Sequence, residues 1–106
     1  MQTTYQSEIN GLVPALRAAK NNDVNEINYL SSIGVDLSQG DYDRRTPLHI
    51  AVRSGSFEVV KLLISLGARI DALDRWGSTP LNYAVYNVDM FNLLLSMGAH
   101  KGFQQP

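Results

Sequence analysis

Two histidines are the first candidates for acid–base chemistry in this 106-residue chain, because histidine titrates near neutral pH. His49 follows Thr46 by three residues, and a hydrogen bond to that threonine or to nearby backbone would satisfy a buried ring. We therefore interpret His49 as a structural turn residue. His100 has no second His, Asp or Glu at ligand spacing. Since a metal site needs three or four converging ligands, we expect His100 to bind no metal.

The carboxylates, glycines and serines also lack the spacing of a catalytic or cofactor site. Asp23 and Glu26 share a helix face, but a charged first helical turn explains this pair better than a general acid and base. The glycines Gly67, Gly77 and Gly98 form no phosphate-binding loop, and no serine stands in a nucleophile elbow. The sequence therefore predicts no enzyme activity, no metal and no cofactor.

Composition indicates one ordinary globular domain. Hydrophobic residues make up 44% and charged residues 18% of the chain, and no apolar run approaches the ~20 residues of a membrane span. Nine Lys and Arg against ten Asp and Glu give a net charge of -1, which argues against a nucleic-acid partner. The chain has no cysteine and no basic leader at its start. We expect a cytoplasmic protein that contacts neither membrane nor nucleic acid.

A shift of 33 residues aligns the chain with itself. The second and third copies share a turn and helix start, in which Thr46, Pro47, Leu48 and Ala51 recur as Thr79, Pro80, Leu81 and Ala84. The third copy loses two residues after Val85. These matches predict a repeat domain over residues 11–102, with repeats at 11–43, 44–76 and 77–102 and tails at 1–10 and 103–106.

Each repeat is expected to fold as a turn, a short helix, a tight loop and a second helix. In repeat two, Thr46 is a good N-cap for a helix over 47–54, and Gly55 suits its end. A second helix is expected over 57–66, with an apolar face broad enough for a helix packed between neighbours. The polar outer face of repeat one and the tail after Lys101 are typical of solenoid caps. The pattern therefore predicts an all-α solenoid.

The run Thr46-Pro47-Leu48-His49-Ile50-Ala51 resembles the signature of the ankyrin repeat. The resemblance covers roughly residues 8–102 and implies stacked helix–turn–helix units with hairpin tips. In repeat three Asn82 replaces the signature histidine, and Val88 stands where a glycine is expected between the helices. The resemblance implies a structural role for Thr46, Pro47, Leu48, His49, Ala51, Thr79, Pro80, Leu81 and Ala84.

Two turn segments suggest possible host proteins. Residues 41–46 and 74–79 resemble segments of the C-terminal ankyrin modules of glutaminases and ankyrin-bearing L-asparaginases, and plant ankyrin-bearing kinases have a similar Asp-Arg-Trp-Gly-Ser-Thr stretch. None of the catalytic motifs of those enzymes is present in this chain. The resemblance therefore implies a module without enzyme activity of its own.

Ankyrin stacks bind partners on a concave surface made by the turn tips and the first helices. Carried over by position, this surface comprises Lys20, Tyr42, Asp43, Arg45, Arg53, Arg75, Trp76, Ser78, Tyr86 and Asn87. Trp, Tyr and Arg are enriched at interface hot spots. In an alternative interpretation, Tyr42 and Trp76 cover the turn backbone with an arginine stacked on them.

Two functions from different classes remain open. The leading hypothesis is a protein-interaction module whose partner, on the concave surface, is another protein or another domain of the same protein. The alternative is a regulatory or self-association segment of a larger enzyme such as a glutaminase or asparaginase, which would make the chain a homo-oligomer. Catalysis by the chain itself would need a convergent triad or metal site that no spacing suggests.

Overall fold

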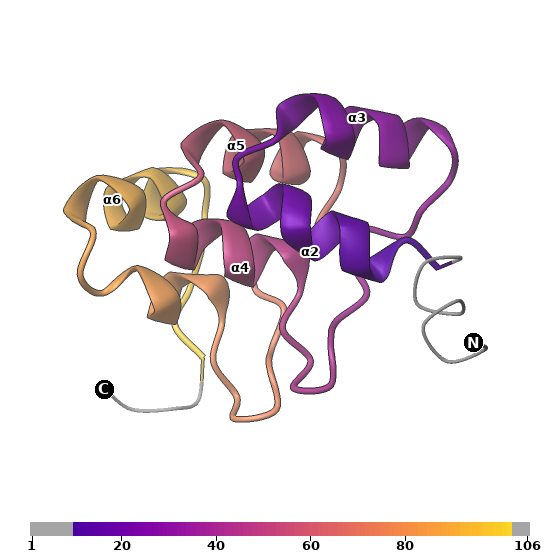
Figure 1. The fold of residues 1–106 in the computed structure, drawn as a ribbon. Coiled ribbons are helices and arrows are strands. Elements are labelled where there is room, and N and C mark those ends of the chain that lie inside the picture. Colours follow the sequence, from indigo (N-terminus) through magenta and orange to yellow (C-terminus); the bar gives the residue numbers. More distant parts are fainter. Residues whose placement is uncertain (1–9, 103–106) are drawn as a thin grey trace.

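The computed structural model describes residues 10–102, so the expected tail 103–106 and most of the tail 1–10 lie outside the described residues. The described chain forms helices in two layers (Figure 1). The first helices of the three repeats are α2 (Leu12–Lys20), α4 (Pro47–Ser54) and the 3₁₀ helix η1 (Pro80–Ala84), and the second helices are α3 (Val24–Ser32), α5 (Phe57–Ser65) and α6 (Val88–Ser96). The described residues contain no strand, which confirms the all-α prediction.

The first helix of repeat two begins and ends as the sequence predicts. Thr46 accepts a hydrogen bond from the His49 amide, Pro47 occupies the first turn, and Gly55 closes α4 in the left-handed region. The second helix stops at Ser65, one residue earlier than expected, with Leu66 as its C-cap. None of the helices in residues 10–102 is long and apolar enough to cross a membrane.

The second helices of all three repeats end in the same way. A glycine with φ near 90° follows each helix, and the next amide donates a 3.0 Å hydrogen bond to a leucine carbonyl in the last turn. The leucines that accept these bonds are Leu30, Leu63 and Leu94, and all are at most 3% exposed. Their equivalence is what a stack of like repeats requires.

The core lies between the two helix layers and continues across the repeat boundaries. Small buried residues on the first helices, such as Ala18 and Ala51, let α2 pack against α4 and α4 against η1. Aliphatic side chains of the second helices, such as Val60 and Leu63, fill the space between the layers. This packing fixes the first helices side by side and sets their outer faces in a row (Figure 1).

One repeat also stabilises a helix of the next. Ser56 begins α5, but its side chain makes no cap hydrogen bond to that helix. Instead the Asn22 side chain of repeat one accepts a 3.0 Å hydrogen bond from the Val59 amide and donates a 2.8 Å bond to Glu58. Asn22 has φ 55° and occupies the loop position of Gly55. It therefore caps a helix in the neighbouring repeat, a role that the sequence did not indicate.

Arg44 occupies a backbone position that suits glycine. Its φ is 62°, and the equivalent residues of the other repeats, Gly11 and Gly77, have φ 77° and 80°. A side chain in this left-handed region is strained by about 1–2 kcal/mol. Repeat two therefore contains a turn that its own sequence does not optimise.

Repeat three leaves an apolar end. Its 3₁₀ first helix has five residues, since two residues are lost before α6. Val85 is 51% exposed, whereas the equivalent Val52 of repeat two is 1% exposed because repeat three covers it. Val85, Val88, Phe91 and Lys101 line a hollow of about 270 Å³ at this end. The described outer face of repeat three is thus apolar rather than the polar cap expected from the tail.

Candidate functional site

His49 joins two repeats. Its Nδ1 accepts hydrogen bonds from the Thr46 amide (3.1 Å) and hydroxyl (3.0 Å), and its Nε2 donates to the Ser78 carbonyl of repeat three (3.0 Å). The ring is completely buried, and this burial lowers the pKa of His49 below its ordinary value. Because both ring nitrogens are occupied, no lone pair is available for acid–base catalysis. The geometry confirms the interpretation of His49 as a structural turn residue.

His100 has a partner that the sequence analysis missed. Its Nδ1 lies 2.8 Å from the Asp71 carboxylate, and its amide donates a 2.8 Å hydrogen bond to the other carboxylate oxygen. The two residues are 29 positions apart, and only the stacking of repeats two and three brings them together. Within residues 10–102 no group of three or more His, Cys, Asp and Glu side chains could hold a metal ion. We interpret the pair as a surface ion-pair contact between repeats.

The tips, residues 41–45 and 74–78, are hairpin turns built around an aspartate. Asp41 and Asp74 each accept hydrogen bonds from the amides two and four residues further along. The tips are joined by Arg75, whose amide donates to the Asp43 carbonyl (2.8 Å) and whose guanidinium donates to the Asp43 carboxylate (3.1 Å). The expected neighbouring hairpin tips are therefore present and linked.

Four residues of the predicted binding surface have structural duties. Ser78 is 5% exposed, and its backbone bonds to Asp74 and His49. Asn87 caps α6 by accepting a 3.0 Å hydrogen bond from the Met90 amide. Asp43 and Arg45 form an ion pair with each other (3.4 Å) and are both largely covered. We therefore remove Ser78 from the candidate surface, because its side chain is inaccessible, and treat the other three as supporting residues.

The aromatic residues of the tips differ in exposure. Tyr42 is 98% exposed, whereas Trp76 is 52% exposed and lies beneath the Arg75 guanidinium, 5.4 Å from the ring centroid. The stacking interpretation thus describes Trp76 correctly but not Tyr42. Tyr42 is held only by its backbone within the turn, and its whole ring faces solvent.

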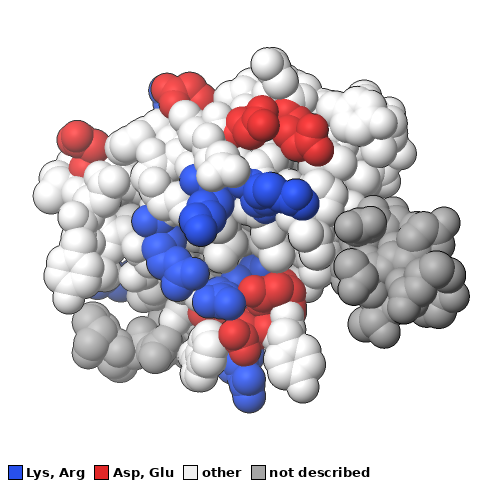
Figure 2. Space-filling view, in the orientation of Figure 1, with Lys and Arg blue, Asp and Glu red and all other residues white. Residues whose placement is uncertain are grey.

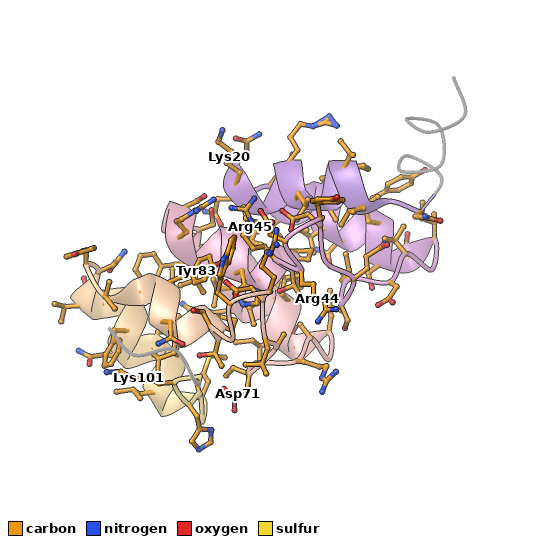
Figure 3. The ribbon with its side chains drawn as sticks, turned by 90° about the horizontal axis from the view of Figure 1, so that it is seen from below. Lys20, Arg44, Arg45, Asp71, Tyr83 and Lys101 are labelled. Atoms are coloured by element: carbon orange, nitrogen blue, oxygen red, sulfur yellow. The ribbon has the colours of Figure 1, made fainter. Side chains whose placement is uncertain are left out.

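The first helices present equivalent residues in two short rows. Lys20, Arg53 and Tyr86 occupy one repeat position, and all three are exposed, Tyr86 to 99%. Arg17 and Tyr83 occupy the same position three residues earlier in repeats one and three. Figure 3, which looks onto this side from below, shows Lys20, Arg45 and Tyr83 along it. We call the surface made by the tips and by these rows the concave face.

Tyr83 was not singled out from the sequence, yet it organises the centre of the concave face. Its hydroxyl donates a 2.5 Å hydrogen bond to Asp74, and its ring packs on His49 with centroids 4.9 Å apart. The Arg53 guanidinium lies over the same ring, 5.7 Å from its centroid. Its position three residues before Tyr86, on the same helical face, is the signal that would have found it.

The buried pair beneath Arg53 has a fixed protonation pattern. Burial and the Asp74 carboxylate both raise the pKa of the Tyr83 hydroxyl, which therefore stays protonated and donates. Burial alone would raise the pKa of Asp74, but hydrogen bonds from Tyr83 and from the Ser78 and Trp76 amides outweigh it and lower the pKa. Asp74 is thus ionised and fully hydrogen-bonded, which makes this region a rigid base for the exposed residues above it.

Charge is unevenly distributed on this side of the molecule. Figure 2 shows Lys and Arg side chains gathered across the middle of the view, with Asp and Glu above them and at the tips below. The basic residues of the first helices stand in the last turns, Arg17 and Lys20 in α2 and Arg53 in α4. Cations at a helix C-terminus are stabilised by the helix dipole, which accounts for their tolerance as a group.

Comparisons with known proteins identify the fold independently. Residues 15–105 match the family described as ankyrin repeats (3 copies). Serine/threonine-protein kinase 12 of Arabidopsis thaliana is 39% identical over 94 residues, which cover 87% of this chain and 20% of the kinase. The mitochondrial liver isoform of glutaminase from Rattus norvegicus is 41% identical over 76 residues, covering 70% of this chain and 12% of the glutaminase. Potassium channel GORK of A. thaliana is 46% identical over 55 residues, covering 52% of this chain and 7% of the channel.

The chain spans a fifth or less of the length of each of these relatives. The similarity is therefore to a module shared by a kinase, a metabolic enzyme and a channel, as the resemblance of the tip segments to glutaminases and plant kinases predicted. The residues that carry it include the signature run 46–51 and its copy at 79–84, whose buried threonine and proline begin α4 and η1. With the family match over most of its length and three stacked helix pairs, this chain belongs to the ankyrin-repeat family.

Proposed function

We propose that this chain is a protein-interaction module that binds a partner on its concave face. The observation that carries the proposal is the row formed by Lys20, Arg53 and Tyr86. These exposed residues stand at one repeat position on packed helices, and none of them forms an ion pair or a side-chain hydrogen bond within residues 10–102. Tyr and Arg in such positions are the residue types that dominate interface energetics.

The stack suits this role because it holds the row in a fixed arrangement before binding. Arg53 rests on Tyr83, which is anchored on Asp74, and the tips are tied together by Arg75 and Asp43. A surface that is already ordered loses less conformational entropy on association. Tyr42, Arg75 and Trp76 extend the proposed surface along the tips, with Asp43 and Arg45 supporting it.

In this proposal the module performs no chemistry and needs no cofactor. The partner is another protein or another domain of the same protein, and the setting is cytoplasmic. His49 and His100, the residues that first suggested acid–base chemistry, are both used in contacts between repeats. The role of the chain is then to hold and position its partner.

A second function is supported by the relatives. The glutaminase, the kinase and the channel each contain a similar module within a much longer protein. In such a setting the module would regulate a larger enzyme or bring its subunits together. Light scattering after size exclusion separates the two ideas, because self-association predicts a mass that rises with protein concentration.

A triple variant tests the leading proposal. Arg53→Ala, Trp76→Ala and Tyr86→Ala together should abolish capture of the partner from native lysate while the melting temperature shifts by only a few degrees. A matched control replaces the exposed residues Tyr29, Lys61 and Asn92 of the second helices by alanine and should leave capture intact. Capture that survives the first variant, or is lost equally in the control, would remove the concave face as the binding surface.

A further inference from the structure

The concave face carries cations that no carboxylate neutralises. Arg17, Lys20 and Arg53 are exposed, and none of them is in an ion pair within residues 10–102. The nearby tip carboxylates are occupied, since Asp41 pairs with Arg45 and Asp43 with both Arg45 and Arg75. The acids of the tips are therefore compensated locally, whereas the basic residues of the first helices are not.

The arrangement of these cations is regular because the repeats are regular. Lys20 and Arg53 are separated by one repeat, so they lie about 8–10 Å apart, which is the packing distance of neighbouring helices. At the next repeat the same position holds Tyr86, and Tyr83 stands beside it. The concave face is thus basic over repeats one and two and aromatic over repeat three.

From this pattern we infer that the partner presents an acidic segment to the concave face. The inference rests on the proposed function and specifies its partner. An extended peptide rises about 3.3 Å per residue, so roughly three residues span one repeat. Carboxylates at every third position would meet Lys20 and Arg53 in turn. An apolar or aromatic residue at the following third position would then lie against Tyr86.

The tips favour a peptide over a nucleic acid. Asp41 and Asp43 lie along the edge of the basic row, with side chains 20% and 25% exposed, and would repel a continuous phosphate backbone. A peptide can place neutral residues opposite these acids and carboxylates opposite the cations. The net charge of -1 likewise gives no long-range attraction for nucleic acid.

A pair of synthetic peptides tests the inference. The probe is a fluorescein-labelled 12-residue peptide with Glu at every third position and a Phe near one end, and its control has Gln in place of each Glu. In fluorescence anisotropy the Glu peptide should bind about tenfold more tightly than the Gln peptide, because exposed ion pairs contribute 0.2–1 kcal/mol each. This preference should shrink at about 0.3 M salt, where screening acts over roughly 6 Å.

Charge-removing variants locate the binding site. Arg53→Gln and Lys20→Gln should each weaken binding of the Glu peptide about two- to fivefold. Lys61→Gln, on the exposed side of α5, is the matched control and should have no effect. Since all three side chains are exposed, their melting temperatures should agree with that of the wild type.

Three results would overturn the inference: equal affinity for the Glu and Gln peptides, equal weakening by Lys61→Gln, or tighter binding of a single-stranded oligonucleotide than of the Glu peptide. The triple variant described above distinguishes this failure from that of the proposed function. If that variant loses partner capture while the Glu peptide shows no preference, the concave face binds a protein but not through acidic residues.

Discussion

Replacing His49 should show how much of the stability depends on the connection between repeats two and three. In His49→Ala the buried Thr46 amide loses its acceptor, which costs about 1–3 kcal/mol for an unsatisfied group. The Ser78 carbonyl loses one of its two hydrogen bonds but keeps that from the Asp74 amide, so this loss is about 1 kcal/mol. We therefore expect a total destabilisation of about 2–4 kcal/mol, a large part of the stability of a small domain.

The chain itself provides the matched control for this substitution. In repeat three Asn82 occupies the position of His49, and its side-chain oxygen accepts a 2.9 Å hydrogen bond from the Thr79 amide. His49→Asn should therefore retain the bond to Thr46 and lose mainly the reach to Ser78. The expected destabilisation is about 1–2 kcal/mol, smaller than that of His49→Ala.

Urea denaturation followed by circular dichroism at pH 7.5 measures both values. The account requires the order wild type, His49→Asn, His49→Ala in decreasing free energy of unfolding. If His49→Ala were within about 0.5 kcal/mol of wild type, the ring would not be bonded as described. A larger loss for the asparagine variant than for alanine would equally contradict the reasoning.

Four further predictions follow from individual contacts. Arg44→Gly relieves the strained turn and should raise stability by about 0.5–1 kcal/mol, or about 2–6 °C in melting temperature, by calorimetry; an unchanged or lower value would refute the strain. Asn22→Ala removes the cap at the Val59 amide and should cost about 1–2 kcal/mol in urea titrations, so a neutral result would reject the cap. Leu63→Ala leaves a cavity in the core and should cost about 2–5 kcal/mol, and a loss below 1 kcal/mol would argue against tight stacking. Because burial lowers the pKa of His49, the unfolded chain binds more protons as pH falls through 6.5, and the free energy of unfolding should fall with it; the same pH profile in His49→Asn would assign the effect to another group.

The regular part of this fold was predictable because it depends on local rules. Thr46, Pro47 and Gly55 specify the start and end of α4 through capping and backbone preference, and the structure reproduces these bounds. The 33-residue spacing predicted that Leu30 and Leu63 are equivalent, and both are buried. Such features are repeated in each unit, so the sequence displays them more than once.

Contacts between repeats were harder to foresee. The cap of Asn22 on α5 and the pairing of His100 with Asp71 join residues that are 37 and 29 positions apart, and both depend on how the units stack. The exposure of Val85 likewise depends on whether a neighbour covers it. A spacing pattern within one repeat contains none of this information.

The candidate binding surface was predictable in position but not residue by residue. Serine and asparagine serve equally as surface residues and as caps, so the sequence alone did not show that Ser78 is buried or that Asn87 caps α6. Tyr83 was overlooked because its role depends on Asp74 and Arg53, which approach it only in the folded chain.

Both proposals require that equivalent positions of the first helices lie side by side on one face, and crosslinking tests this requirement most directly. The chain has no cysteine, so Lys20→Cys with Arg53→Cys introduces a single pair of thiols. A bis-maleimide that spans about 10 Å, one helix-packing distance, should join this pair rapidly within one molecule. The control pair Lys20→Cys with Ser96→Cys, on helices two repeats apart and in opposite layers, should not crosslink at a comparable rate (Figure 1). Equal rates for the two pairs, or no intramolecular crosslink between positions 20 and 53, would contradict the arrangement on which the binding surface depends.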